Sequence, residues 1–205
     1  MDNKTLAQAV RKVLKGYLFI FVSINLLGFD LLPDFIGYIM ILSALPVISE
    51  KEKSAKLLKP IGTVLGIWSL LEWILKIGYA QINIKIVLIL ISVLGIYVDY
   101  QLITNISELA SDSKIKRRIR ILRDTVVITH TVASIFVMFP KLVYAALAVG
   151  IVQFIMFIWI LIEFRRLAKA LENEDAENKE SALSPEENEN QTDSIINEET
   201  NEPKD

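Results

Sequence analysis

The stretch that most constrains the fold is LLPDFIGYIM, residues 31–40, which follows Gly28 and Asp30. Its Pro-Asp turn lies between two apolar runs, one ending at Leu27 and one continuing to Val47. Gly and Pro interrupt helices, and Asp favours the position where a new helix begins. Such a turn is typical of the point where one transmembrane helix leaves the bilayer and the next re-enters it. We therefore predict that residues 31–40 form the tip of the first of three transmembrane hairpins.

Composition and hydropathy favour a membrane protein over a soluble domain. Of the 205 residues, 53% are hydrophobic, the mean hydropathy is +0.44, and the apolar residues gather in blocks. We predict an all-α, polytopic bundle of about six transmembrane helices. The expected helices cover residues 5–28, 33–47, 60–80, 84–100, 124–139 and 142–170, and the fourth either ends at Tyr100 or continues outside the membrane to Leu109. The first two are short against the roughly 20 residues that a bilayer core requires, so either one is tilted or the pair does not cross fully.

The first apolar run follows several cations, as in a signal peptide, but no small-residue cleavage motif comes after it. We therefore expect an uncleaved first span.

The Lys and Arg residues give an independent argument for the six-span count. Of 22, 19 lie before the first span, in the connectors 50–59 and 114–123, or from Arg165 onward. The other three, Lys76, Lys85 and Lys141, lie near the opposite turns. Under the positive-inside rule, this distribution predicts a multi-pass protein of the cell (plasma) membrane. Both termini and the two long connectors are then cytoplasmic, and the three short turns face outward.

The chain divides into a basic body and an acidic end. Residues 1–172 hold 20 Lys and Arg against 12 Asp and Glu, a net charge of +8, whereas residues 173–205 hold 2 against 12, a net charge of −10. A segment so acidic and so poor in apolar residues buries too little surface to offset its ordering entropy. We predict a transmembrane domain over residues 1–172 and a disordered acidic cytoplasmic tail over residues 173–205.

Three residues of the first outer turn, Asp30, Pro33 and Asp34, have two interpretations. Two carboxylates at an outer membrane surface suit a cation or a basic partner. Alternatively, they cap the second helix and complement its dipole, with Pro33 in the first turn, where its missing N–H costs little.

Small residues at a spacing of four predict two helix-packing patches. Gly62 and Gly66 form a GxxxG pattern in the third expected helix, and Ala146 with Gly150 forms a similar patch in the sixth. Such patches allow close approach of another helix. They serve either packing within one molecule or a homo-oligomer seam.

Five polar residues within the expected spans form a candidate intramembrane polar site: Glu72, Lys76, Asp99, His130 and Gln153. Ionisable residues in a span are functional hypotheses, because their burial is costly. Glu72 and Lys76 are four residues apart, so an ion pair is expected, although Lys76 also lies close enough to the outer interface to extend into it. His130 is either a titrating group or a hydrogen-bonded packing residue. Gln153 either forms a hydrogen bond between helices or lines a pathway across the membrane.

Two of these residues, Asp99 and His130, lie beside other polar or small residues on the same helix face, so that each belongs to a polar stripe along its helix. Asp99 shares a face of the fourth helix with Ser92 and Gly95, and His130 borders a stripe of the fifth helix that includes Ser134. One interpretation is that the two stripes line a cavity facing the cytoplasm.

The connector SDSKIKRRIRILR, residues 111–123, interleaves cations with Ile and Leu and predicts an interfacial amphipathic helix. Its position between two spans favours anionic lipid headgroups as its partner. The residues expected to make these contacts are Lys114, Lys116, Arg117, Arg118 and Arg120. Base-stacking aromatic residues are missing from the segment, so we do not expect nucleic acid.

The sequence carries no recognisable catalytic pattern. It has no Cys and a single His, which exclude thiolate chemistry and a His-rich metal centre. It has no phosphate-binding glycine loop, and no complete constellation of an intramembrane protease. We expect no enzyme, cofactor or metal site.

Residues 24–45, which contain LLPDFIGYIM, resemble a motif of uncharacterised small multi-pass membrane proteins of Gram-positive bacteria. The resemblance implies a membrane location and carries no activity with it.

The favoured function is therefore a non-catalytic accessory, regulatory or immunity-type membrane subunit, with a homo-oligomer or another membrane protein as its partner. The alternative is a small oligomeric transporter or channel for an ion or small solute. A membrane enzyme with an unrecognised site is a third class.

Overall fold

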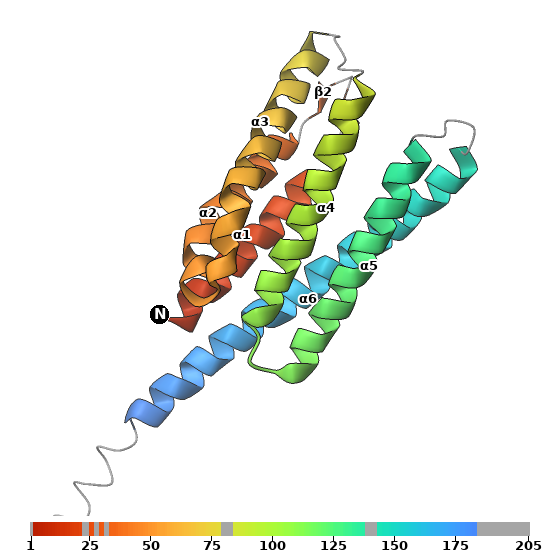
Figure 1. Ribbon diagram of the computed structural model, residues 1–205. Coiled ribbons are helices and arrows are strands. Elements are labelled where there is room, and N and C mark those ends of the chain that lie inside the picture. The colour runs from red at the N-terminus through yellow and green to blue at the C-terminus, as the bar shows by residue number, and fades with distance from the viewer. Residues whose placement is uncertain are drawn as a thin grey trace, which may run out of the picture.

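The computed structural model describes residues 2–21, 25–26, 29–30, 33–78, 84–137 and 143–183. Within this part of the chain the fold is built from helices, as predicted (Figure 1). The α-helices are α1 (Asn3–Phe21), α2 (Asp34–Lys51), α3 (Leu58–Ile77), α4 (Lys85–Glu108), α5 (Ser113–Val137) and α6 (Val143–Leu183). A 3-10 helix, η1 (Lys53–Leu57), links α2 to α3, and the two-residue strands β1 (Asn25–Leu26) and β2 (Phe29–Asp30) pair antiparallel.

Three helical segments of the described chain are long and apolar enough to cross a membrane. They are Lys53–Ile77, which joins η1 to α3, Lys85–Glu108, which is α4, and Leu147–Ser181 within α6. The other three helices carry more charge: α1 contains four Lys and Arg, α2 has charged residues at both ends, and α5 has six cations in its first half.

The helices pack pairwise, and α1 and α6 join the first half of the chain to the second. Helix α1 lies between α2 and α6, while α3 covers α2, α5 packs on α4, and α6 returns along α5 (Figure 1). Aromatic rings join α1 to α6: Phe21 stacks on Phe157 with ring centres 4.9 Å apart, and Tyr17 meets Phe164 edge-on at 6.0 Å. Segments at opposite ends of the sequence therefore share one core.

Glycines set the close crossing of α1 and α2. A Cβ atom added to Gly16 would lie 2.7 Å from the carbonyl oxygen of Gly37, and one added to Gly37 would lie 2.5 Å from that of Gly16. Contacts this short are not tolerated, so only glycine at both positions allows the two backbones to approach. The sequence pattern did not single out this pair, because the two glycines lie on different helices.

The buried core lies toward one end of the bundle, the end that holds the start of α1, η1 and the α4–α5 turn. We call it the cationic end, because most Lys and Arg residues lie there. Fully buried side chains in this part include Leu6 of α1, Ile48 of α2, Ile106 of α4, Leu122 of α5 and Leu171 of α6.

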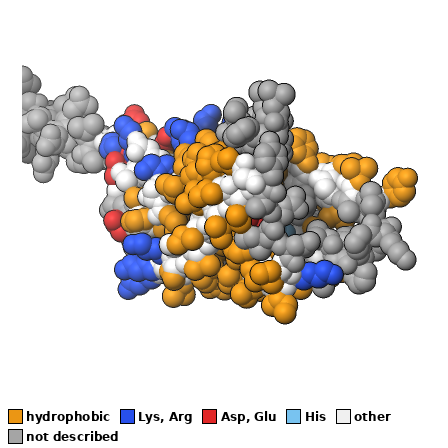
Figure 2. Space-filling model, turned by 90° about the horizontal axis from the view of Figure 1, so that it is seen from above, with side chains coloured by type: hydrophobic (Ala, Val, Ile, Leu, Met, Phe, Trp, Pro, Cys, Tyr) orange, Lys and Arg blue, Asp and Glu red, His pale blue; other side chains and the backbone are white. Residues whose placement is uncertain are grey.

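The other half of the molecule exposes a band of apolar side chains. We call it the apolar band, and it comprises Val64, Ile67, Leu70, Leu71, Ile74 and Ile77 of α3, Ile86, Leu88, Ile89, Leu90, Val93, Tyr97 and Tyr100 of α4, Ile128, Val132 and Ile135 of α5, and Tyr144, Leu147, Ile151, Val152, Phe154, Ile155, Ile158 and Ile162 of α6. Seen from above, hydrophobic side chains cover much of the molecule, and most of the Lys and Arg lie toward one end (Figure 2).

Several element boundaries differ from the sequence prediction; α2, for example, continues to Lys51 rather than ending at Val47. Helix α1 ends at Phe21 rather than near Gly28, and the short β1–β2 pair follows where Asn25 and Asp30 favour turns. Helix α5 is continuous from Ser113 to Val137, because no Gly or Pro separates the basic segment from the apolar one.

Helix α6 passes the expected end at Ala170 and continues to Leu183, so the prediction of a disordered tail from Asn173 is wrong for residues 173–183. That stretch is rich in Glu, Ala and Lys, which favour helices. Residues 184–205 lie outside the described part of the chain.

Candidate functional site

The central polar contact of the bundle joins three helices at Asp99 of α4. Tyr17 of α1 donates its hydroxyl proton to Asp99 Oδ1 over 3.1 Å, and His130 Nδ1 of α5 lies 3.0 Å from Asp99 Oδ2. Both carboxylate oxygens are thus engaged. The side chain of Asp99 is 14% exposed and that of His130 is 32% exposed, so the pair lies at the edge of the core. A carboxylate held by two neighbours in this way ties α1, α4 and α5 together.

The sequence did not indicate Tyr17, because a tyrosine next to an apolar run carries no polar signal of its own. Tyr17 continues the buried side of α1 that Leu6, Val10 and Val13 form, at helical spacing. That periodicity could have indicated that its hydroxyl enters the core, where a buried hydroxyl needs a partner.

A second polar contact lies farther along the same α4–α5 seam. Ser92 Oγ and Ser134 Oγ are 2.6 Å apart, and Ser134 also donates to the backbone carbonyl of His130 at 2.9 Å. Because a hydroxyl has only one proton, Ser92 donates to Ser134. Gly95, between Ser92 and Asp99, leaves room for the imidazole, since an added Cβ would reach His130 Cε1 at 4.0 Å. The two predicted stripes therefore meet and bond to each other.

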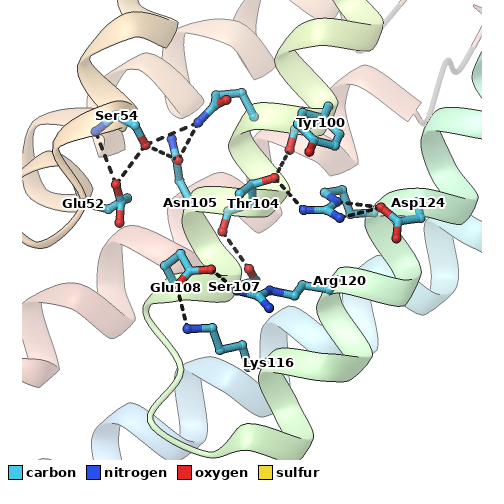
Figure 3. Close-up of polar contacts among 12 residues, drawn as sticks. Glu52, Ser54, Tyr100, Thr104, Asn105, Ser107, Glu108, Lys116, Arg120 and Asp124 are labelled. Carbon is cyan, nitrogen blue, oxygen red and sulfur yellow. Dashed lines mark hydrogen bonds and ion pairs between the residues drawn. The ribbon is translucent and has the colours of Figure 1, made fainter.

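A third polar cluster joins η1 to α4 at the cationic end (Figure 3). Asn105 is 1% exposed. With its amide nitrogen facing Ser54, it donates to Ser54 Oγ at 2.7 Å and accepts from the Ala55 backbone N–H at 3.2 Å. Ser54 in turn donates to Glu52 Oε1 at 2.9 Å, and the side-chain amide of Gln101, one turn earlier on α4, lies 2.9 Å from that of Asn105. The sequence did not indicate this cluster, because residues 50–59 predict only a charged connector between two helices.

A neighbouring face of α4 contacts cations of α5 (Figure 3). Glu108 accepts from Lys116 at 2.5 Å and from Arg120 at 2.6 Å. The Arg123 guanidinium lies 4.6 Å from the centre of the Tyr100 ring and donates to Thr104 Oγ1 at 3.2 Å. These contacts fix the first half of α5 against α4.

Glu163 of α6 is a buried carboxylate that the sequence analysis did not consider. The residue is 2% exposed, and its Oε1 accepts from Arg166 at 2.9 Å and from Trp159 Nε1 at 3.3 Å. Its other oxygen has no hydrogen-bond partner among the described residues.

The C-terminal part of α6 is fastened to the start of the chain. Arg11 of α1 pairs with Glu172 at 2.7 Å, and Glu174 accepts from Asn3 at 3.4 Å and from Ser111 at 3.2 Å. Beyond these contacts α6 projects past the other helices (Figure 1).

The other predicted polar residues stay apart from the Asp99 contact. Glu72 and Lys76 form no ion pair within the described chain; Glu72 is half-buried, and Lys76 is exposed. Gln153 is half-buried on α6, and no hydrogen bond of its side chain is found among the described residues.

At the turn predicted to face outward, Pro33 occupies the N-cap position of α2, and Asp34 lies in the first turn of the helix, where its charge complements the helix dipole. The Asp30 side chain lies outside the described residues.

The two predicted small-residue patches differ in what they contact. Gly62 and Gly66 pack on α2: added Cβ atoms would lie 3.1 Å from Leu42 Cδ2 and 3.3 Å from Tyr38 Cβ, respectively. The patch thus serves packing between α2 and α3. A Cβ added to Gly150 would meet no described atom within 4 Å, and the Ala146 side chain lies outside the described residues.

The described part of the chain shows little that could hold a metal or another ligand. No group of three or more His, Cys, Asp and Glu residues there is placed to hold a metal ion. A cavity of about 220 Å³ lies at the cationic end, lined by Asn3, Leu6, Glu50 and Lys51, and none of these belongs to the Asp99 contact.

Comparison of the chain with family models, curated proteins and solved structures finds no match.

Proposed function

We propose that this chain is a multi-pass protein of the cell membrane with six spans in three hairpins. The start of α1, η1, the α4–α5 turn and the end of α6 are on the cytoplasmic side. Three observations support this arrangement: the three segments long enough to cross a membrane, the apolar band, and the cations gathered at the opposite end. The α1–α2 hairpin returns to the cationic end, so this sidedness does not depend on whether α1 and α2 cross completely.

Within the membrane, the protein acts as a non-catalytic accessory, regulatory or immunity-type subunit that binds another membrane protein. The observation that carries this proposal is the bonding of embedded polar groups to one another. Asp99 is held by Tyr17 and His130, and Ser92 by Ser134. Polar groups bonded across helices fix a scaffold, and the outward surface left for recognition is apolar.

A partner is expected on α6, whose outward residues Phe154 and Ile155 are 60% and 55% exposed. Small residues flank this surface at Ala148 and Gly150 and permit close approach of another helix.

Site-specific photo-crosslinking in native membranes tests this proposal. A photoreactive phenylalanine at Phe154 is expected to give one discrete protein adduct of higher mass. The matched control is Phe164 of the same helix, which is 0% exposed and should give no intermolecular adduct. Adducts with lipid alone at Phe154, and at Leu147 and Ile158 on the same outward surface, would contradict a partner on α6.

The alternative, a small oligomeric transporter or channel, is favoured by one observation. Asp99 and His130 form an ionisable pair in the α4–α5 seam, and about a third of the His130 side chain is exposed. Flux of protons or cations into vesicles containing the purified protein, abolished by Asp99→Asn in a protein that still inserts, would favour transport. The accessory function predicts no flux in wild type or variant.

A further inference from the structure

The basic first half of α5 has two faces with different surroundings. Three of its six cations point toward α4 and are paired there: Lys116 and Arg120 with Glu108, and Arg123 with Thr104, Asp124 and the ring of Tyr100. The Arg123 side chain is only 16% exposed. These three cations hold α5 against α4. Because they are paired within the protein, they are less able to bind a further anion.

The other three cations, Lys114, Arg117 and Arg118, point away from the bundle. All three are exposed, and their side chains form no ion pair or hydrogen bond with any residue that the structure describes. At 100° per residue, Lys114 and Arg118 lie on one side of α5, with Arg117 beside them. The N-terminal part of the outward face of α5 therefore carries positive charges that no described residue pairs with.

Beyond Asp124, which lies on the same outward face and pairs with Arg123, this face is apolar. Ile121 is 46% exposed, and Ile128 and Ile135 beyond it are 62% and 51% exposed. Arg118 and Ile128 are about 15 Å apart along the axis at 1.5 Å per residue. Cations followed by apolar side chains over this distance match the change from headgroups to hydrocarbon in a bilayer.

The neighbouring helix places the same boundary at the same level. The apolar band of α4 runs from Ile86 and ends with Tyr97 and Tyr100, and amphipathic rings favour the membrane interface. Because Arg123 lies over the Tyr100 ring, the change from charged to apolar exposed side chains occurs at the same level on α4 and α5. The boundary is thus marked on α4 and α5 independently.

We propose that Lys114, Arg117 and Arg118 bind the phosphates of anionic phospholipid headgroups in the cytoplasmic leaflet, with Ile121 inserted at the acyl boundary below them. This proposal rests on the proposed membrane function. It also revises the sequence prediction, which assigned Lys116 and Arg120 to the lipid as well: those two cations neutralise Glu108 and serve the contact between α4 and α5. Guanidinium and ammonium groups near an anionic leaflet attract its headgroups.

Native mass spectrometry of the full-length protein in a nonionic detergent tests the proposal. The probes are phosphatidylglycerol and phosphatidylcholine with identical acyl chains. The wild type should retain phosphatidylglycerol preferentially. Replacing the outward set together (Lys114→Gln, Arg117→Gln and Arg118→Gln) should reduce that preference roughly tenfold or more, with the thermal unfolding temperature unchanged.

The matched control replaces two inward cations, Lys116→Gln and Arg120→Gln. It should keep the lipid preference and lower the unfolding temperature instead. An outward variant that still prefers phosphatidylglycerol, or a preference abolished by millimolar inorganic phosphate, would overturn the proposal.

The membrane function is measured separately, by resistance of the wild type to extraction from membranes with alkaline carbonate. Failure of the lipid test with intact carbonate resistance would therefore leave the proposed function standing.

Discussion

The hydroxyl of Tyr17 donates a hydrogen bond to Asp99 across 82 positions of sequence, at 3.1 Å. Tyr17 is 2% exposed, so its hydroxyl has no access to bulk water. This bond joins the first helix of the chain to the α4–α5 hairpin, which otherwise packs mainly on α6 and within itself. The Tyr17–Asp99 bond therefore links α1 directly to α4, in addition to the packing that α1 and α5 share with α6.

Tyr17→Phe is expected to destabilise the protein by about 1–3 kcal/mol, because it removes the donor and leaves one oxygen of Asp99 unpaired. The measurement is thermal unfolding of the purified protein in detergent. Tyr97→Phe, at a site that is 38% exposed, is the control and should change little. Equal stability of the two variants would show that the Tyr17–Asp99 bond does not hold α1 in place.

Gly16→Ala is expected to be strongly destabilising, since its methyl group would lie 2.7 Å from the Gly37 carbonyl oxygen. Forcing α1 and α2 apart should cost about 1–3 kcal/mol or more. Gly150→Ala is the matched control, because nothing described lies within 4 Å of its added Cβ. That control should be neutral or stabilise α6 by up to about 1 kcal/mol. Expression level and unfolding temperature measure both, and a neutral Gly16→Ala would refute the close crossing.

Replacing Glu108 with Gln is expected to loosen α5 from α4, because Lys116 and Arg120 lose their shared partner. The loss should be modest, about 1 kcal/mol or less, since both ion pairs are partly exposed. It should shrink further in high salt, which screens the wild-type pairs. Unfolding in low and high salt measures it. A loss of stability independent of salt would indicate that Glu108 acts through packing rather than charge.

The pairing of Arg11 with Glu172 is testable by a double-mutant cycle with Arg11→Ala and Glu172→Ala. A coupling energy of about 0.2–1 kcal/mol is expected for this exposed pair. Glu177→Ala, farther along the exposed part of α6, should show no coupling to Arg11. No coupling at Glu172 would mean that α6 is not fastened to α1 through this pair.

Helical content and the polar stripes of α4 and α5 were accessible from the sequence, because periodicity and residue type determine both. Asp99, His130, Ser92 and Ser134 were chosen for their places on single helices, and the structure pairs them across two. Their partner Tyr17 was not foreseen, since a tyrosine among apolar residues carries no signal of its own.

Helix ends were the least predictable feature. The acidic composition after Asn173 predicts disorder, yet the Glu residues that make this segment polar also favour a helix, as do its Ala residues, and contacts of Glu172 and Glu174 hold its beginning. Likewise, the Gly16–Gly37 crossing depends on which helices meet, and no single-helix pattern contains that information.

The central claim is that the cationic end faces the cytoplasm and the opposite turns face outward. Because the chain has no cysteine, single cysteines at Arg117, Glu177, Ile84 and Tyr144 can be labelled in intact cells with a membrane-impermeant maleimide. The account predicts labelling at Ile84 and Tyr144, and labelling at Arg117 and Glu177 only after the membrane is opened. Labelling of the cysteines at positions 117 and 177 from opposite faces of the membrane would contradict the account.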